Sequence, residues 1–148
     1  MNVGRKLFLA GPFKGLLNPN TGTMTDDEKQ KFLKLIAFFE SKGFLVHNAH
    51  QREAWGKALM TPEQCTEIDF NEIASCDYFV GLPGHPPSPG THIEIGWASA
   101  LKKPIILLLE AGKEYGFLIQ GLYTVANVTY ITYHSEADYL KGLEAIFS

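Results

Sequence analysis

The sequence of 148 residues contains only two cysteines, Cys65 and Cys76, which are too few for a disulfide scaffold. It also lacks the paired ligand spacings, such as C-x-x-C and H-E-x-x-H, that mark common metal sites. The short apolar run near the N-terminus is followed at once by Pro12 and Lys14, with neither the length of a membrane span nor a signal-peptide cleavage pattern. We therefore expect a cytoplasmic protein with no membrane contact and no bound metal.

Positive charge is scarce as well. The chain has 13 Lys and Arg against 16 Asp and Glu, a net charge of −3, and no long basic run. This balance argues against a surface that binds nucleic acid. A hydrophobic content of 45% with 20% charged residues is ordinary for a globular protein, and this length suffices for one sizeable core. We expect residues 1–148 to form a single domain.

What the chain does contain is a regular alternation of short apolar runs and amphipathic segments. The apolar runs resemble buried parallel strands, and the segments between them carry helix-start signals such as Thr25 and the Thr61–Gln64 capping box. This rhythm predicts one α/β domain, Rossmann-like or flavodoxin-like, with a parallel sheet of about five strands and helices on both faces. The expected strands are Lys6–Gly11, Phe44–His47, Tyr78–Leu82, Ile105–Leu109 and Val128–Tyr133. The expected helices begin near Thr25, Thr61, Thr91 and Ser135, and residues 13–24 are expected to form a loop over a site.

The most informative stretch is Pro86–Ala98, a proline-rich loop that leads into a helix between two expected strands. Loops at the strand ends of α/β sheets are where such folds bind ligands. Glu94 then has two interpretations. With Thr91 as N-cap it would be the third residue of a capping box and would only stabilise the helix. Alternatively, a carboxylate near a helix N-terminus stays ionised, which suits a nucleophile.

Asp69 lies on the helix that begins after Thr61, on or beside the apolar stripe expected to face the sheet. A carboxylate there costs free energy unless it is hydrogen-bonded or opens onto a polar cavity. One interpretation places it at the solvated edge of the stripe, and the favoured one makes it a site residue. Together with Glu94 it could perform glycosyl chemistry, with one carboxylate attacking and the other handling protons.

The turn after the first strand, Gly11–Gly15, matches neither a Walker loop nor G-x-G-x-x-G, which disfavours a dinucleotide or nucleoside triphosphate site. Its backbone N–H groups could still hold a hydroxyl or a single phosphate. His47 and His50 follow the second expected strand, so either could line a site, although a structural role is the simpler interpretation for each.

Three segments together resemble the nucleoside 2-deoxyribosyltransferase family, which includes the nucleoside 5'-monophosphate N-glycosidases. They are LFLAGPF, Asp69 eight residues before Asp77, and GTHIEIGWASALKKPIILLL, so that the resemblance extends from about Lys6 to Tyr133. It implies that Glu94 is the nucleophile and that Asp69 assists proton transfer at the nucleobase. It also implies that Gly11, Pro12 and Phe13 form the floor of the sugar pocket, with Ser88 and Gly90 at its 5' side.

The resemblance leaves the substrate open between two classes. Many transferases of this family have an Asp six residues before the nucleophile, whereas this chain has Ser88, as the monophosphate N-glycosidases do. Lys14 also matches a basic residue of the glycosidases. Asn127 instead resembles a transferase residue that binds the 5'-hydroxyl in a neighbouring subunit's site. Because residues 84–94 contain no Lys or Arg, the sequence slightly favours a free nucleoside.

We accordingly expect an enzyme that cleaves the N-glycosidic bond of a (deoxy)nucleoside through a covalent glycosyl-Glu94 intermediate and transfers the sugar to another nucleobase or to water. Its alternatives are a nucleoside 5'-monophosphate N-glycosidase and a non-catalytic nucleotide-binding or sensing module. No cofactor is needed for this chemistry. The resemblance further implies a homodimer or a higher homo-oligomer.

Overall fold

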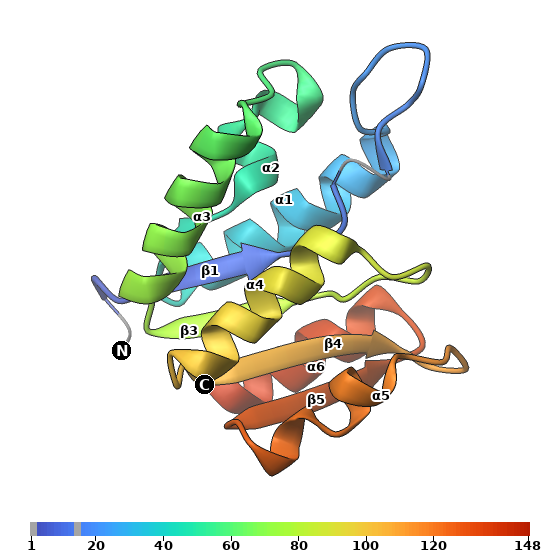
Figure 1. Cartoon of the computed structure of the whole chain (residues 1–148). Coiled ribbons are helices and arrows are strands. Elements are labelled where there is room, and N and C mark those ends of the chain that lie inside the picture. The colour runs from blue at the N-terminus through green and yellow to red at the C-terminus, as the bar shows by residue number, and fades with distance from the viewer. Residues whose placement is uncertain (1–2, 14–15) are drawn as a thin grey trace.

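The computed structural model describes residues 3–13 and 16–148, and it contains one five-stranded parallel sheet (Figure 1). The strand order β2-β1-β3-β4-β5 is that of flavodoxin-like folds, which confirms the predicted fold class. Each strand lies within one or two residues of its expected bounds. The strands are β1 (Lys6–Ala10), β2 (Leu45–His47), β3 (Tyr78–Gly81), β4 (Ile105–Glu110) and β5 (Val128–Tyr133).

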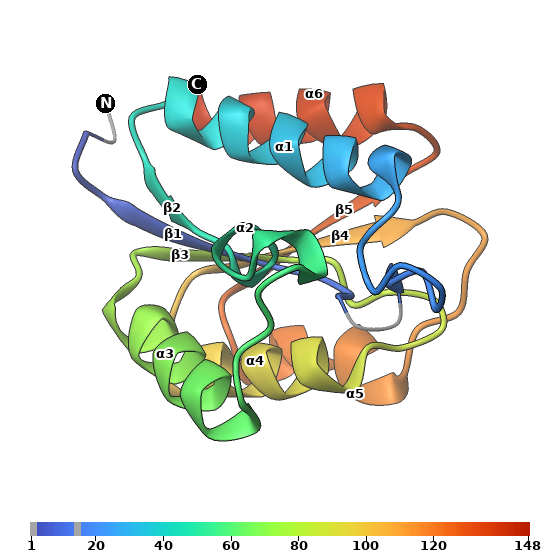
Figure 2. The ribbon, with the colours of Figure 1, turned by 90° about the horizontal axis from the view of Figure 1, so that it is seen from above.

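Helices cover both faces of the sheet (Figure 2). One face carries α1 (Asp26–Ser41) and α6 (Glu136–Phe147), and the other carries α3 (Pro62–Ser75), α4 (Pro89–Ala100) and α5 (Phe117–Gln120). Alternate residues of each strand point to opposite faces, and the two apolar cores follow this alternation. Leu7 and Leu9 pack under α1 and α6, whereas Phe8 and Ala10 pack with Ile73 of α3 and Ile95 of α4.

The helix starts follow local capping rules. Thr25 caps α1 through the backbone N–H of Glu28, and Thr61 caps α3 in the predicted capping box with Gln64. Four short elements in the described part of the chain were not expected. They are α2 (Ala49–Arg52), α5, and the 3₁₀ turns η2 (Ala54–Gly56) and η3 (Leu122–Thr124).

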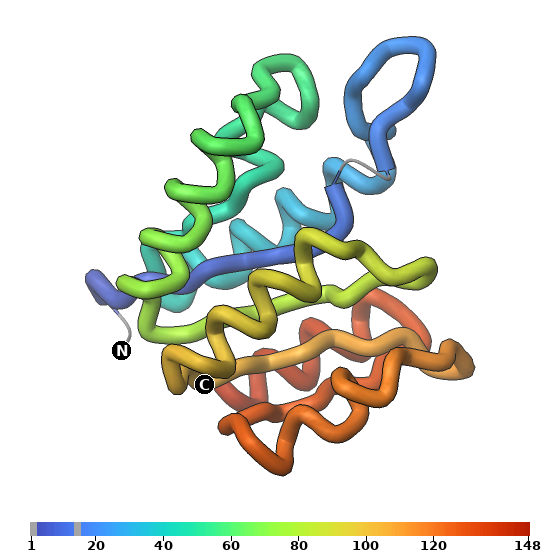
Figure 3. Tube along the Cα trace, in the orientation of Figure 1, coloured from blue at the N-terminus to red at the C-terminus, as the bar shows by residue number. Residues whose placement is uncertain are grey.

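The connections around β1 and β3 create the site. The chain leaves β1 toward α1 on one face of the sheet and leaves β3 toward α4 on the other (Figure 2). This divergence of neighbouring strands places a crevice between their carboxyl ends. Residues 16–24 form a loop that projects beyond this edge, closed by the bridge between Leu17 and Met24 (Figure 3).

Among the described residues, no helix has both the length and the apolar character that crossing a membrane requires.

Candidate active site

A cavity of about 500 Å³ lies at the carboxyl ends of β1 and β3. Its wall comes from the turn after β1, from α2 and α3, and from the loop that leads into α4. Most of the residues predicted for the site line this one cavity. They are Gly11, Pro12, Phe13, Asp69, Ser88, Gly90 and Glu94. Lys14 lies outside the described residues.

Helix α4 begins three residues earlier than the sequence suggested. Ser88, not Thr91, is the N-cap, and its hydroxyl accepts a hydrogen bond from the backbone N–H of Thr91 at 3.4 Å. Pro89 occupies the first helical position, where its fixed φ and missing N–H cost nothing. Glu94 therefore lies in the second turn of α4, so the capping-box interpretation of Thr91 and Glu94 is wrong.

Glu94 instead faces Asp69 of α3. Burial, a hydrogen bond with Asp69 and the charge of Asp69 together raise the pKa of Glu94 to about 9, although the charge of Arg52 opposes them. The expectation that Glu94 stays ionised is thus wrong for the free protein, because the side chain lies too deep and too close to a second carboxylate. At neutral pH Glu94 of the free protein is therefore protonated.

Asp69 is neither solvated nor packed among apolar side chains, since its side chain is 14% exposed and lines the cavity. It forms an ion pair with Arg52 Nη2 through Oδ1. Of the stripe residues around it, Ile73 and Cys76 are buried against the sheet. Asp69 therefore lies where α3 leaves the apolar layer and borders the cavity.

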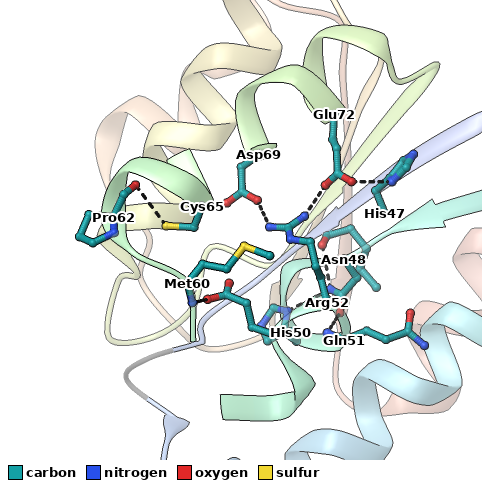
Figure 4. A network of polar contacts seen from close by, with 12 residues as sticks. His47, Asn48, His50, Gln51, Arg52, Met60, Pro62, Cys65, Asp69 and Glu72 are labelled. Atoms are coloured by element: carbon teal, nitrogen blue, oxygen red, sulfur yellow. Dashed lines mark hydrogen bonds and ion pairs between the residues drawn. The ribbon is translucent and has the colours of Figure 1, made fainter. Parts of the chain in front are cut away.

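Arg52 is a site residue that the sequence analysis missed (Figure 4). Its guanidinium lies between Asp69 and Glu72, and Nη1 donates to Glu72 Oε1 at 2.5 Å. Glu53, next to it, is 5% exposed and accepts the backbone N–H of Met60 at 2.9 Å. Helix α2 has only four residues and hence no readable periodicity. The available signal was its place directly after β2, at the edge of the sheet that binds ligands.

The sequence profile described as Nucleoside 2-deoxyribosyltransferase matches residues 7–130. The chain belongs to the nucleoside 2-deoxyribosyltransferase family. The resemblance inferred from the motifs is thereby confirmed. Members of this family are glycosyl transferases or N-glycosidases, and the chain is an enzyme of this class.

Solved structures of related proteins agree with this family. The CMP N-glycosidase BcmB of Clostridium botulinum is 41% identical, with a TM-score of 0.73, and the match covers 95% of this chain and 99% of that one. The solution structure of BlsM is 53% identical, with a TM-score of 0.84 and coverage of 99% and 91%. A 2-deoxyribosyltransferase of Bacillus psychrosaccharolyticus, 18% identical with a TM-score of 0.64 and coverage of 96% and 95%, shares the fold. No curated protein sequence matches the chain.

In this member of the nucleoside 2-deoxyribosyltransferase family, His50 lines the cavity and is 2% exposed. Asn48 Nδ2 donates to His50 Nδ1 at 2.9 Å, so the proton of the imidazole resides on Nε2, which donates to the carbonyl oxygen of Pro12 at 2.8 Å. Burial lowers the pKa of His50 to about 4, and the ring is neutral at ordinary pH. Its ring also stacks on Phe32 and contacts Phe13, with ring centroids 4.1 and 4.7 Å away.

Asn127 lies elsewhere. It precedes β5, is exposed, and its carbonyl oxygen accepts the backbone N–H of Ile105 at the first residue of β4. That position is the amino-terminal edge of the sheet, opposite the cavity (Figure 1). Asn127 therefore does not line the cavity of its own chain, and its role in a neighbouring subunit stays a prediction.

Within residues 3–13 and 16–148, no cluster of three or more His, Cys, Asp or Glu side chains has the arrangement of a metal site. The polar side chains that line the cavity include the carboxyls of Glu53, Asp69 and Glu94, the imidazoles of His50 and His85, and the hydroxyls of Ser88 and Thr91, and the backbone of Gly90 at the start of α4 lines it as well. Such an arrangement combines proton transfer and a carboxylate nucleophile with a site for an anion.

Proposed function

We propose that the protein is an N-glycosidase that hydrolyses a nucleoside 5'-monophosphate through a covalent glycosyl-Glu94 ester. The observation that carries this proposal is the pairing of the Asp69 and Glu94 carboxyls in a cavity at the start of α4, where burial and Asp69 raise the pKa of Glu94. A retaining glycosidase needs one carboxylate as nucleophile and a second acidic group for protons. When the proton resides on Asp69, Glu94 is the carboxylate nucleophile and Asp69 is the acid.

In the first step, the proton of the pair moves to Asp69, and a Glu94 carboxylate oxygen forms a bond to the anomeric carbon. The C–N bond to the base breaks, its electron pair goes to the base, and Asp69 supplies the proton. In the second step, Asp69 takes a proton from water as the water oxygen attacks the anomeric carbon. The ester bond breaks, Glu94 leaves as a carboxylate, and two inversions give net retention.

The start of α4 supports the 5'-phosphate. The hydroxyls of Ser88 and Thr91 are hydrogen-bonded to each other at 2.9 Å, which leaves one hydroxyl hydrogen of the pair to donate to a ligand. Helix α4 has twelve residues, and its dipole favours an anion at this end. Ser88 stands where many transferases have an Asp, which would repel a phosphate. The sequence alone slightly favoured a free nucleoside; we propose the monophosphate because of this helix start and the 41% identity to a CMP N-glycosidase.

The substrate class is tested by measuring base release from CMP, dCMP, cytidine and deoxycytidine, with and without added adenine. Two charge-assisted hydrogen bonds to phosphate predict a kcat/KM roughly 100-fold higher for the monophosphates. Ser88→Ala should reduce this preference, and Ser99→Ala, at the far end of α4, is the matched control. Equal turnover of nucleosides and monophosphates would contradict the phosphate assignment. Sugar transfer to adenine would instead support a deoxyribosyltransferase.

We further expect a homodimer or a higher homo-oligomer. Phe117, Leu118, Tyr123 and Val125 around α5 and η3 are 88%, 87%, 64% and 77% exposed, and such a group of apolar side chains is typical of an interaction surface. Light scattering should give at least twice the mass of one chain, and replacing Phe117 and Leu118 by serine should lower it. A monomer that turns over at the same concentration would contradict this expectation.

A further inference from the structure

The guanidinium of Arg52 connects two carboxylates that lie one turn apart on α3 (Figure 4). Nη2 pairs with Asp69 Oδ1, and Nη1 donates to Glu72 Oε1. The other oxygen of Glu72 is 2.7 Å from His47 Nδ1, at the end of β2. A chain of polar contacts therefore extends from β2 through Arg52 to the Asp69–Glu94 pair.

This arrangement restricts Arg52. Its side chain is 19% exposed, and a planar guanidinium with both terminal nitrogens engaged has one orientation available. Its Nε has no hydrogen-bond partner in the part of the chain that the structure describes, which is costly for a buried donor. The contacts with Asp69 and Glu72 thus hold the guanidinium in place against this cost.

Arg52 also balances the charge around Glu94. Asp69 and Glu53 are the anions that act on Glu94, and Arg52 is the cation that acts in the opposite sense. His50 and Cys65 also line the cavity, and His50 is uncharged at ordinary pH. The charge of Arg52 thus lowers the pKa of Glu94. Without Arg52 the pKa of Glu94 would rise further, and loss of the proton that frees the attacking carboxylate would become harder.

We propose that Arg52 is a positioning residue that pairs with Asp69, directs its carboxylate toward Glu94 and places a positive charge beside the two carboxyls. Glu72, itself fixed by His47, holds Arg52 in this orientation. Arg52 does not touch the reacting atoms and acts through Asp69. This inference rests on the proposed function for its kinetic consequences, but the protonation of the pair can be measured without any substrate.

The kinetic test compares Arg52→Gln and Arg52→Lys with the wild-type enzyme over a range of pH. Arg52→Gln should lower kcat at pH 7 by roughly 10- to 100-fold, with a smaller change in KM. It should also move the acid limb of the kcat profile upward by about one pH unit or more. Arg52→Lys should recover part of both effects because it keeps the charge. The control is Lys42→Gln, which breaks a remote ion pair with Glu144.

The second measurement follows the side-chain carboxyl ¹³C signals of Asp69 and Glu94 by NMR, which separates a failure of this inference from a failure of the proposed function. In the wild-type protein Glu94 should titrate at about pH 9, and in folded Arg52→Gln it should titrate at a higher pH because the charge of Arg52 is gone. The assignment would be overturned if Arg52→Gln left the titration of the two carboxyls unchanged. It would also be overturned if the activity of Arg52→Gln fell only in proportion to the loss of folded protein, with no shift of the pH profile. If Arg52→Gln shifts the carboxyl titration as expected but the wild-type protein cleaves no nucleotide, the proposed function is refuted and the role of Arg52 is not.

Discussion

Replacing Glu94 by glutamine is expected to lower kcat by a factor of roughly 10³ or more while the protein stays folded. The amide cannot form the glycosyl ester, yet it has the shape of the carboxyl group and can donate a hydrogen bond to Asp69. Turnover is measured by base release, and folding by circular dichroism. Glu40→Gln, at an exposed position of α1, serves as the control. Retained turnover in folded Glu94→Gln would refute the nucleophile.

The same variant should be more stable than the wild-type protein. The pKa of Glu94 is raised from 4.5 to about 9, so the folded state binds the proton more tightly than the unfolded chain. Above pH 4.5 this difference lowers the free energy of unfolding of the wild-type protein, increasingly up to about pH 9. Glu94→Gln removes the effect, and we expect a gain of roughly 1–3 kcal/mol at pH 8 and little gain below pH 4.5. Denaturant unfolding at both pH values measures it.

Asp69→Asn is expected to lower kcat for a nucleoside monophosphate by about 10²- to 10⁴-fold, because the leaving base then receives no proton. A 4-nitrophenyl riboside 5'-phosphate has a leaving group that departs without protonation, so its cleavage should fall far less. Asn71→Ala, an exposed position on the same helix, is the control. An equal loss with both substrates would indicate that Asp69 acts on the fold or on the nucleophile and not on the base.

Strands and most helices could be predicted because their signals are local. The fully apolar run Ile105–Leu108 is typical of a buried strand, and Thr61 with Gln64 is a local signal for a helix start. The start of α4 was misplaced because both Ser88 and Thr91 are good N-caps. Pro89 decided between them, since a proline fits the first turn of a helix and restricts the residue before it to extended conformations.

The sequence motifs predicted that Asp69 and Glu94 belong to one site. They could not predict which of the two carboxyls carries a proton. The pKa of Glu94 depends on Asp69, Arg52 and Glu53, which come from other elements and meet only in the folded chain. Arg52 itself has no sequence signal beyond its place after β2. Residues whose role arises from tertiary contacts of this kind need the structure, because no spacing along the chain encodes which charges will face one another.

The fixed tautomer of His50 makes the cavity wall resistant to mild acid. Protonation would place a second donor at Nδ1, facing the amide N–H of Asn48, and the wall would lose a hydrogen bond and gain a repulsion. Because burial lowers the pKa of His50 to about 4, this happens only near pH 4 and below. Between pH 5 and 8, where most histidines change their charge, the link from α2 through Pro12 to the turn after β1 stays intact. The shape of this part of the cavity wall is therefore independent of the proton transfer proposed for Asp69 and Glu94 in the same cavity.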